Sequence, residues 1–145
     1  AVTGEINNLN DARRRRIIGP RPRVRAATYT VEESRRGPAL VEIRLDASAR
    51  PYKVPLLYYR AVAAEVASTA EPQLFATIKA AASRGLGEEL PDYPARVSLR
   101  FWSASGLVNH EGARFTRVGT KAEFTRRVRD AWKNASSAPF EVHPD

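Results

Sequence analysis

Seven arginines and no acidic residue fall within residues 13–25, RRRRIIGPRPRVR. This composition is that of an arm, because two prolines and a glycine in it interrupt a helix and favour an extended, polyproline-like backbone. A chain of 145 residues with 43% hydrophobic residues can fill one hydrophobic core. We therefore expect a basic N-terminal arm over residues 1–26, followed by a single domain over residues 27–145 that ends in a short C-terminal tail.

The net charge of the chain is unevenly placed. The sequence carries 24 Lys and Arg against 16 Asp and Glu, a formal net charge of +8, of which residues 13–25 supply +7. A second basic region, residues 114–133, carries +5, so the remaining chain has a charge of about −4. Charge distributed in this way predicts two basic contact regions on a mildly acidic body.

Several classes of site and location are disfavoured by what the sequence lacks. It has no cysteine, which excludes disulfides, thiolate metal sites and a cysteine nucleophile, and two histidines are few for a metal site. No nucleotide-binding or metalloprotease motif occurs, so we expect no cofactor and no metal. No apolar run approaches the roughly 20 residues of a membrane-spanning helix, and the N-terminus has no signal-peptide core. We expect a soluble protein without a membrane partner; the compartment stays open, with virion and cytoplasm both plausible.

The first part of the domain alternates with a period of two. Residues 27–33 place Tyr29 and Val31 on one face, and residues 39–46 alternate three apolar side chains with three charged ones. The apolar set is Val41, Ile43 and Leu45, and the charged set is Glu42, Arg44 and Asp46. This pattern predicts an antiparallel hairpin with one solvated face and a loop from Ser34 to Pro38 that is long enough to be mobile.

Helical spacing follows over residues 55–85. Two apolar stripes predict two helices, of which the second ends at Gly85. The helices are joined near Ser68 and Glu71, which have capping-box spacing. We interpret the proline-containing residues 85–94 as a linker.

The last third contains a second group of strands and a helix. Alternation in residues 95–102 and 113–118 predicts two strands, with a loop over residues 103–112 between them. Thr120 and Glu123 form a capping box that opens a final helix, and the C-terminal tail is a candidate edge strand. The chain is thus predicted to be α+β, with an antiparallel sheet of about four strands in the order β-β-α-α-β-β-α, packed by helices.

Arginine-rich segments of this kind favour contact with nucleic-acid phosphate, because the guanidinium group pairs with two phosphate oxygens at once. The final helix offers further basic residues away from its apolar stripe, although an ordinary solvated face explains the same pattern. The candidate nucleic-acid-binding residues are Arg13, Arg14, Arg15, Arg16, Arg21, Arg23, Arg25, Arg126, Arg127, Arg129 and Lys133.

Aromatic side chains offer a second means of contact. Tyr58 and Tyr59, and likewise Phe101 and Trp102, are neighbours in sequence, so one member of each pair should face the core. Tyr58 or Trp102 is left as a candidate for stacking on a base or for burial at a subunit contact, with core or interface the favoured interpretation.

Catalysis has one local candidate, the group formed by His110, Glu111 and Arg114 with Asn109. A histidine moves protons near neutral pH, a carboxylate orients it and an arginine stabilises a phosphate, as a metal-independent ribonuclease requires. However, residues adjacent in a strand point to opposite sides, and a solvent-exposed loop histidine is the commoner case. We therefore expect no enzyme.

The leading functional hypothesis is a structural protein that binds RNA or DNA through phosphate contacts and assembles into a homo-oligomer, such as a coat, nucleocapsid or nucleoid component. A basic arm ahead of a compact domain is similar in layout to small viral coat proteins, and this resemblance assigns no residue a role. Two alternatives remain. In one, the arm exchanges between subunits of a shell, tube or filament and docks on acids such as Glu88, Glu89 and Asp92; in the other, the protein is a small RNase-like enzyme that uses His110.

Overall fold

The computed structural model describes residues 26–45 and 50–143. The arm over residues 1–26 therefore lies outside the described residues, except for Ala26. The elements of the described chain are β2 (Ala27–Ser34), β3 (Gly37–Arg44), β4 (Tyr52–Pro55), α1 (Leu56–Ala67), β5 (Gln73–Leu74), α2 (Phe75–Leu86), α3 (Asp92–Ala104), β6 (Val108–Glu111), β7 (Arg114–Arg117), α4 (Lys121–Ser137) and β8 (Phe140–Val142).

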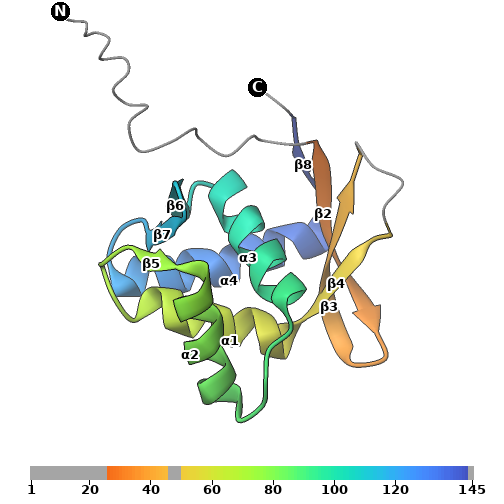
Figure 1. The fold of residues 1–145 in the computed structure, drawn as a ribbon. Coiled ribbons are helices and arrows are strands. Elements are labelled where there is room, and N and C mark those ends of the chain that lie inside the picture. Colours follow the sequence, from red (N-terminus) through yellow and green to blue (C-terminus); the bar gives the residue numbers. More distant parts are fainter. Residues whose placement is uncertain (1–25, 46–49, 144–145) are drawn as a thin grey trace, which may run out of the picture.

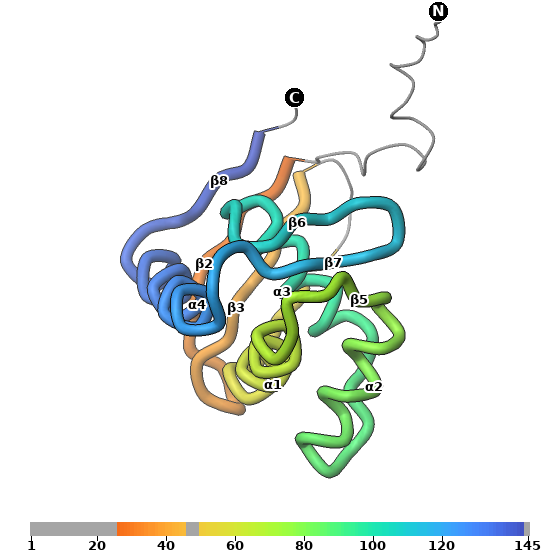
Figure 2. The backbone as a smooth tube through the Cα atoms, turned by 90° about the vertical axis from the view of Figure 1, so that its left-hand side faces the viewer, coloured from red at the N-terminus to blue at the C-terminus, as the bar shows by residue number. Residues whose placement is uncertain are grey.

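The domain is α+β, as the sequence predicts, with a four-stranded antiparallel sheet in the order β4-β3-β2-β8. The helices pack against one face of this sheet (Figure 1). A smaller sheet, in the order β5-β7-β6, lies apart from it (Figure 2). β4, β5 and β6 were not predicted, because each is only two to four residues long and too short to show a periodic pattern.

The predicted hairpin is present, but on its second strand Val41 alone of the three predicted apolar side chains is buried, at 2% exposed, and Glu42 faces the helices. Tyr29 pairs with Glu42 in the register, so both side chains point to the helices, and Glu42 is 1% exposed. Ile43, predicted to face the core, is 37% exposed, and Leu45 is 64% exposed. The turn is also shorter than predicted, because Ser34 pairs with Gly37. A charged residue occupies the core face because one helix and the neighbouring strand supply its partners.

These partners come from β2 and α3. The Arg100 guanidinium donates to both carboxylate oxygens of Glu42 at 2.8 Å, and the Tyr29 hydroxyl donates to one of them at 2.7 Å. Burial disfavours the charged form of Arg100, but the hydrogen bonds and charge of Glu42 outweigh it and raise the pKa of Arg100. Burial together with the neighbouring carboxylate raises the pKa of Tyr29, which stays a hydrogen-bond donor. The ion pair therefore joins the sheet to α3.

The predicted strand over residues 95–102 is wrong, because these residues belong to α3. Pro94 falls in the first turn of the helix, where a missing backbone N–H is tolerated. α3 is buried on most of its circumference, including Val97, Ser98, Leu99 and Trp102. The less buried residues Tyr93, Arg96 and Arg100 recur at helical spacing, but Tyr93 lies in the segment interpreted as a linker, and the alternation of the next residues then indicated a strand.

The two helices predicted over residues 55–85 are present as α1 and α2, with different boundaries. Ser68 follows α1 and donates to the Glu65 carbonyl, so it opens no capping box. α2 starts only at Phe75 and ends at Leu86, and it is capped by Gly87, whose φ of 76° suits glycine.

The final helix matches its prediction. The Thr120 hydroxyl accepts from the Glu123 backbone N–H at 3.1 Å, and the Glu123 carboxylate accepts from the Thr120 N–H at 2.9 Å. Phe124, Val128 and Ala135 are buried, and β8 pairs with β2 as an edge strand. Within one core cluster, the Trp102 indole donates to the Tyr59 hydroxyl, which donates to the Val128 carbonyl of α4.

The ion pair predicts an asymmetry between two substitutions. The Glu42 side chain has no exposed surface, whereas 40% of the Arg100 side chain is exposed. Arg100→Leu leaves a buried carboxylate without its cation and should lower the free energy of unfolding by about 3–5 kcal/mol. Glu42→Leu should cost less, because Arg100 can turn to water. Urea denaturation measures both; the double variant should be more stable than Arg100→Leu, and equal costs for the two single variants would contradict this account.

Candidate nucleic-acid interface

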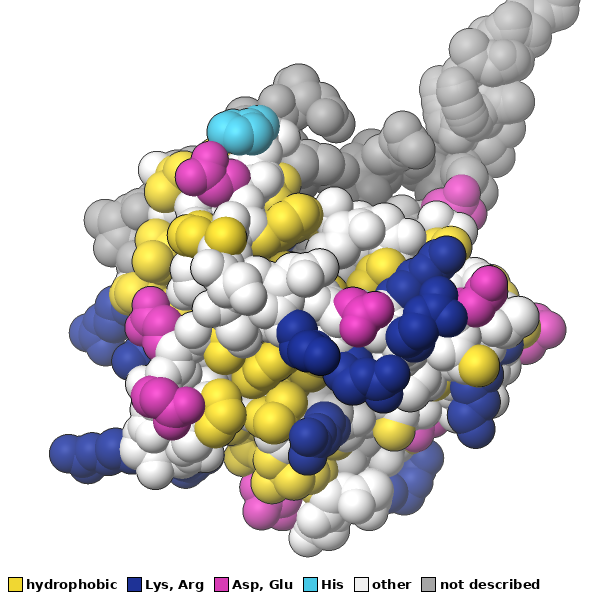
Figure 3. Space-filling view, turned by 180° about the vertical axis from the view of Figure 1, so that it is seen from behind, with side chains coloured by type: hydrophobic (Ala, Val, Ile, Leu, Met, Phe, Trp, Pro, Cys, Tyr) yellow, Lys and Arg dark blue, Asp and Glu magenta, His cyan; other side chains and the backbone are white. Residues whose placement is uncertain are grey.

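Three of the four basic residues predicted on the final helix share its outward face. Arg126, Arg129 and Lys133 follow one another at three and four residues, so they form one stripe along α4. All three are exposed, while Phe124 and Val128 on the opposite side are buried. We call these three residues the α4 stripe. α4 lies behind α3 in Figure 1, and the view from behind in Figure 3 shows Lys and Arg side chains gathered with interspersed acids.

Few acids compete for the α4 stripe. Among the described residues, no carboxylate lies within salt-bridge distance of Arg126, Arg129 or Lys133. Glu123 is held by the helix cap: the hydrogen bonds from Thr120 lower its pKa most, and the charges of Arg127 and Arg126 contribute less. The other acid of α4 is Asp130, one turn beyond Arg126. The stripe therefore presents cations that a polyanion can pair with.

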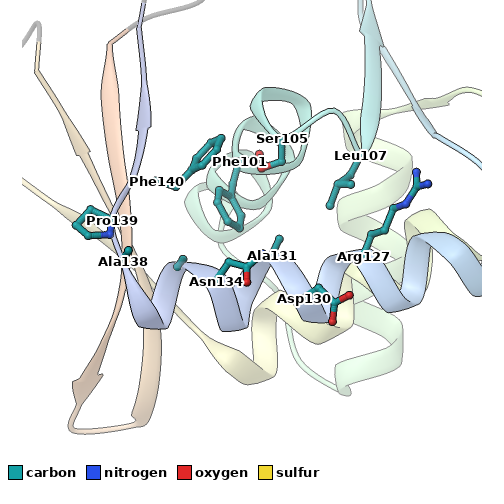
Figure 4. A pocket seen from close by; sticks show the side chains of 11 residues that line it. Phe101, Ser105, Leu107, Arg127, Asp130, Ala131, Asn134, Ala138, Pro139 and Phe140 are labelled. Carbon is teal, nitrogen blue, oxygen red and sulfur yellow. Dashed lines mark hydrogen bonds between the residues drawn. The ribbon is translucent and has the colours of Figure 1, made fainter.

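Arg127 lies on the flank of α4 and not in the stripe. With Asp130 and Asn134 it lines an open groove of about 470 Å³ between α4, the end of α3 and the start of β8. Figure 4 shows Phe101 and Phe140 side by side at one end of the groove and Arg127 at the other. The predicted set thus divides into a stripe of three residues and one groove residue.

The basic excess of residues 114–133 is not one continuous patch. Arg117 donates to the Ala67 carbonyl at the end of α1, at 3.1 Å, and to the Gly119 carbonyl at 3.2 Å. It therefore links two parts of the backbone. Arg114 is exposed on β7, and Lys121 is exposed at the start of α4.

The candidate catalytic residues do not converge. His110 lies on β6 opposite Phe115, and the two rings stack at 4.1 Å between centroids with 21° between planes. Glu111 and Arg114 pair in the neighbouring register position, with side chains on the other side of the hairpin. Burial lowers the pKa of His110, while a backbone hydrogen bond at Gly112 opposes the shift. The geometry gives His110 a packing role, and residues 26–45 and 50–143 contain no cluster of three or more potential His, Cys, Asp or Glu metal ligands.

The other predicted positions fall into two groups. Arg13, Arg14, Arg15, Arg16, Arg21, Arg23 and Arg25 lie outside the described residues. The aromatic pairs at Tyr58–Tyr59 and Phe101–Trp102 are all buried, with 7% or less of each residue exposed, so neither Tyr58 nor Trp102 presents a ring face to a base.

The structure exposes a different pair of aromatic residues. Tyr52 on β4 and Tyr93 on α3 are 37% and 38% exposed, and their rings stack on each other. Neither tyrosine was predicted as a contact residue, because Tyr52 lies between the predicted elements and Tyr93 lies in the segment interpreted as a linker. Their separation of 41 positions in the sequence gave no local signal that they meet.

Comparisons of the chain with protein-family models, with curated proteins and with solved structures found no match. No helix within residues 26–45 and 50–143 combines the length and the apolar character needed to cross a bilayer.

His110 predicts a pH dependence of stability. Its pKa in the folded chain lies below the 6.5 of an unperturbed imidazole, so the unfolded chain binds more protons just below that pH. The free energy of unfolding should therefore fall as the pH is lowered through this range. His110→Phe, which retains a ring against Phe115, should flatten the dependence between about pH 8 and about pH 5 in urea denaturation. A His110→Phe profile identical to wild type would contradict the assignment.

Proposed function

We propose that this protein is a structural nucleic-acid-binding protein, in which an arginine-rich arm and the α4 stripe contact phosphates without reading base sequence. The observation that carries the proposal is the α4 stripe, three exposed cations on one helix face without a salt-bridge partner among the described residues. Cations left unpaired along one face suit a polyanion with regularly spaced charges.

The composition of the arm supports the same proposal. Its seven basic residues are all arginine, with no acid between residues 13 and 25. Arginine pairs bidentately with phosphate and also stacks on bases, whereas lysine would serve a passive solubilising tail equally well. RNA and DNA both supply the phosphates.

The arrangement of acidic residues disfavours arm exchange onto the protein surface. Asp92 forms an ion pair with Lys79 at 2.6 Å, and Glu88 accepts a hydrogen bond from the Tyr58 hydroxyl at 3.0 Å. Glu89 lies 4.0 Å from the same lysine. This acidic surface is thus partly neutralised by the protein itself.

The salt dependence of binding tests the proposal. Deleting residues 1–25 removes seven phosphate contacts and should reduce the slope of log affinity against log salt by roughly 5 to 6. The variant Arg126→Gln, Arg129→Gln, Lys133→Gln should reduce it by roughly 2 to 3. Fluorescence anisotropy with a labelled oligonucleotide over a range of salt concentrations measures both slopes.

A matched variant controls for the loss of three charges. Arg35, Arg60 and Arg84 are exposed on the β2–β3 turn, α1 and α2, and their replacement by Gln changes the net charge equally. This control should keep nearly the wild-type slope. Equal slopes for the two triple variants would show that net charge, and not the α4 stripe, governs binding.

Assembly is tested on the purified particle. Expression without nuclease treatment should yield an oligomer whose ratio of absorbance at 260 nm to that at 280 nm exceeds that of the protein alone. Light scattering gives the mass and absorbance the nucleic-acid content. An oligomer free of nucleic acid would favour the arm-exchange alternative, and a monomer free of nucleic acid would count against the structural role.

A further inference from the structure

Two tyrosines form an exposed stacked pair at the edge of the larger sheet. Among the exposed large hydrophobic side chains of the described residues, Tyr52 and Tyr93 are the two aromatic ones. Their ring centroids are 6.0 Å apart with 26° between the planes. Each ring covers part of the other, and more than a third of each residue remains open to solvent.

Both tyrosines are positioned by regular structure. Tyr52 opens the edge strand β4 and pairs in register with Glu42, and Tyr93 is the second residue of α3. α3 is fixed against the sheet by the bond between Arg100 and Glu42. The aromatic pair is therefore held on α3, which the ion pair fixes to β3, and on β4, which is hydrogen-bonded to β3, so little ordering is needed on binding.

A cation accompanies the aromatic pair. Arg96 lies three residues after Tyr93 on α3, so the two side chains are neighbours on the helix surface, whereas Arg100, one turn further, points to the sheet and binds Glu42. Arg96 is exposed, with its guanidinium 4.0 Å from the centre of the Phe75 ring, and 40% of the Arg100 side chain is exposed. Lys53 follows Tyr52 on β4 and is exposed, but it pairs in register with Val41 and so lies on the opposite face of the sheet from the tyrosines.

The neighbouring carboxylates already have partners. Glu42 is bound by Arg100, and Asp92, next to Tyr93, is bound by Lys79, which lowers the pKa of Asp92. These acids therefore repel an approaching polyanion less than their number suggests. Rigid aromatic faces with adjacent cations are the combination that binds unpaired bases together with their phosphates.

We propose that Tyr52 and Tyr93, with Arg96, form a stacking platform for the bases of single-stranded nucleic acid. The proposal rests on the proposed function and adds a preference for single strands, because in a duplex the base faces are already stacked on each other. A strand on this platform places bases against the tyrosine rings and a phosphate against Arg96.

The test compares Tyr52→Ala/Tyr93→Ala with the wild-type full chain on two probes, oligothymidine and a duplex with the same number of phosphates. Affinity for oligothymidine should fall roughly 5- to 150-fold for each stacked base lost. Affinity for the duplex and the salt slope on both probes should not change. Tyr52→Phe/Tyr93→Phe, which keeps the rings, should restore the binding of oligothymidine.

Leu57→Ala/Leu74→Ala is the matched control, because it removes two exposed apolar side chains, 62% and 40% exposed, from α1 and β5. It should bind both probes as the wild type does. A photo-crosslink from iodouracil-substituted oligothymidine should fall on Tyr52 or Tyr93 in mass spectrometry.

The outcomes separate the two proposals. If neither probe binds the wild type, the proposed function fails and the platform with it. If both probes bind and the alanine variant binds oligothymidine normally, the platform alone is overturned. The platform is also overturned if the variant loses both probes equally, or if it instead changes the mass of the oligomer, which would identify the tyrosines as a protein contact.

Discussion

The buried carboxylate of Glu42 is the constraint on which the arrangement of this domain depends. It faces the helices from the middle of the larger sheet, where a charge is tolerated only with partners at fixed positions. Arg100 supplies two hydrogen bonds from α3 and Tyr29 a third from β2. Because Arg100 must point to the sheet, the rotation of α3 about its axis is set. Trp102 then faces the core, and Tyr93 is carried to the edge strand β4.

The elements that the sequence predicted correctly are those with a local cause. The capping box at Thr120 and Glu123 and the stripe that follows it depend on residues within a few turns of one helix, so α4 could be located without knowing its neighbours. Tertiary partners decided the rest. Which face of β3 turns to the helices depends on the bond between Glu42 and Arg100, which lies 58 positions later in the chain. An alternation pattern within β3 does not contain that information. α3 was mistaken for a strand because its exposed residues are few and two of them, Asp92 and Tyr93, lay in the segment interpreted as a linker.

The candidate site follows the same division. The outward position of Arg126, Arg129 and Lys133 could be predicted, since it is the complement of the Phe124 and Val128 stripe on one helix. The aromatic pairs adjacent in sequence all turned out to lie in the core, where Tyr59 and Trp102 are hydrogen-bonded to each other. The exposed pair, Tyr52 and Tyr93, is assembled from β4 and α3 and exists only once the sheet and α3 are docked.

Basic residues that look alike in sequence have different tasks in the fold. Arg100 neutralises a buried acid, Arg117 links two backbone segments and Lys79 pairs with Asp92, so these cations contribute to structure. The α4 stripe supplies charge without aromatic surface, and charge alone does not distinguish a single strand from a duplex. The tyrosines lie on β4 and α3, away from the α4 stripe. Between the two surfaces lies the core, where Trp102 of α3 contacts Phe124 of α4. Because the two surfaces are separate and chemically different, substitutions in one leave the other intact, so the proposed phosphate contacts and the proposed stacking platform can be separated by experiment.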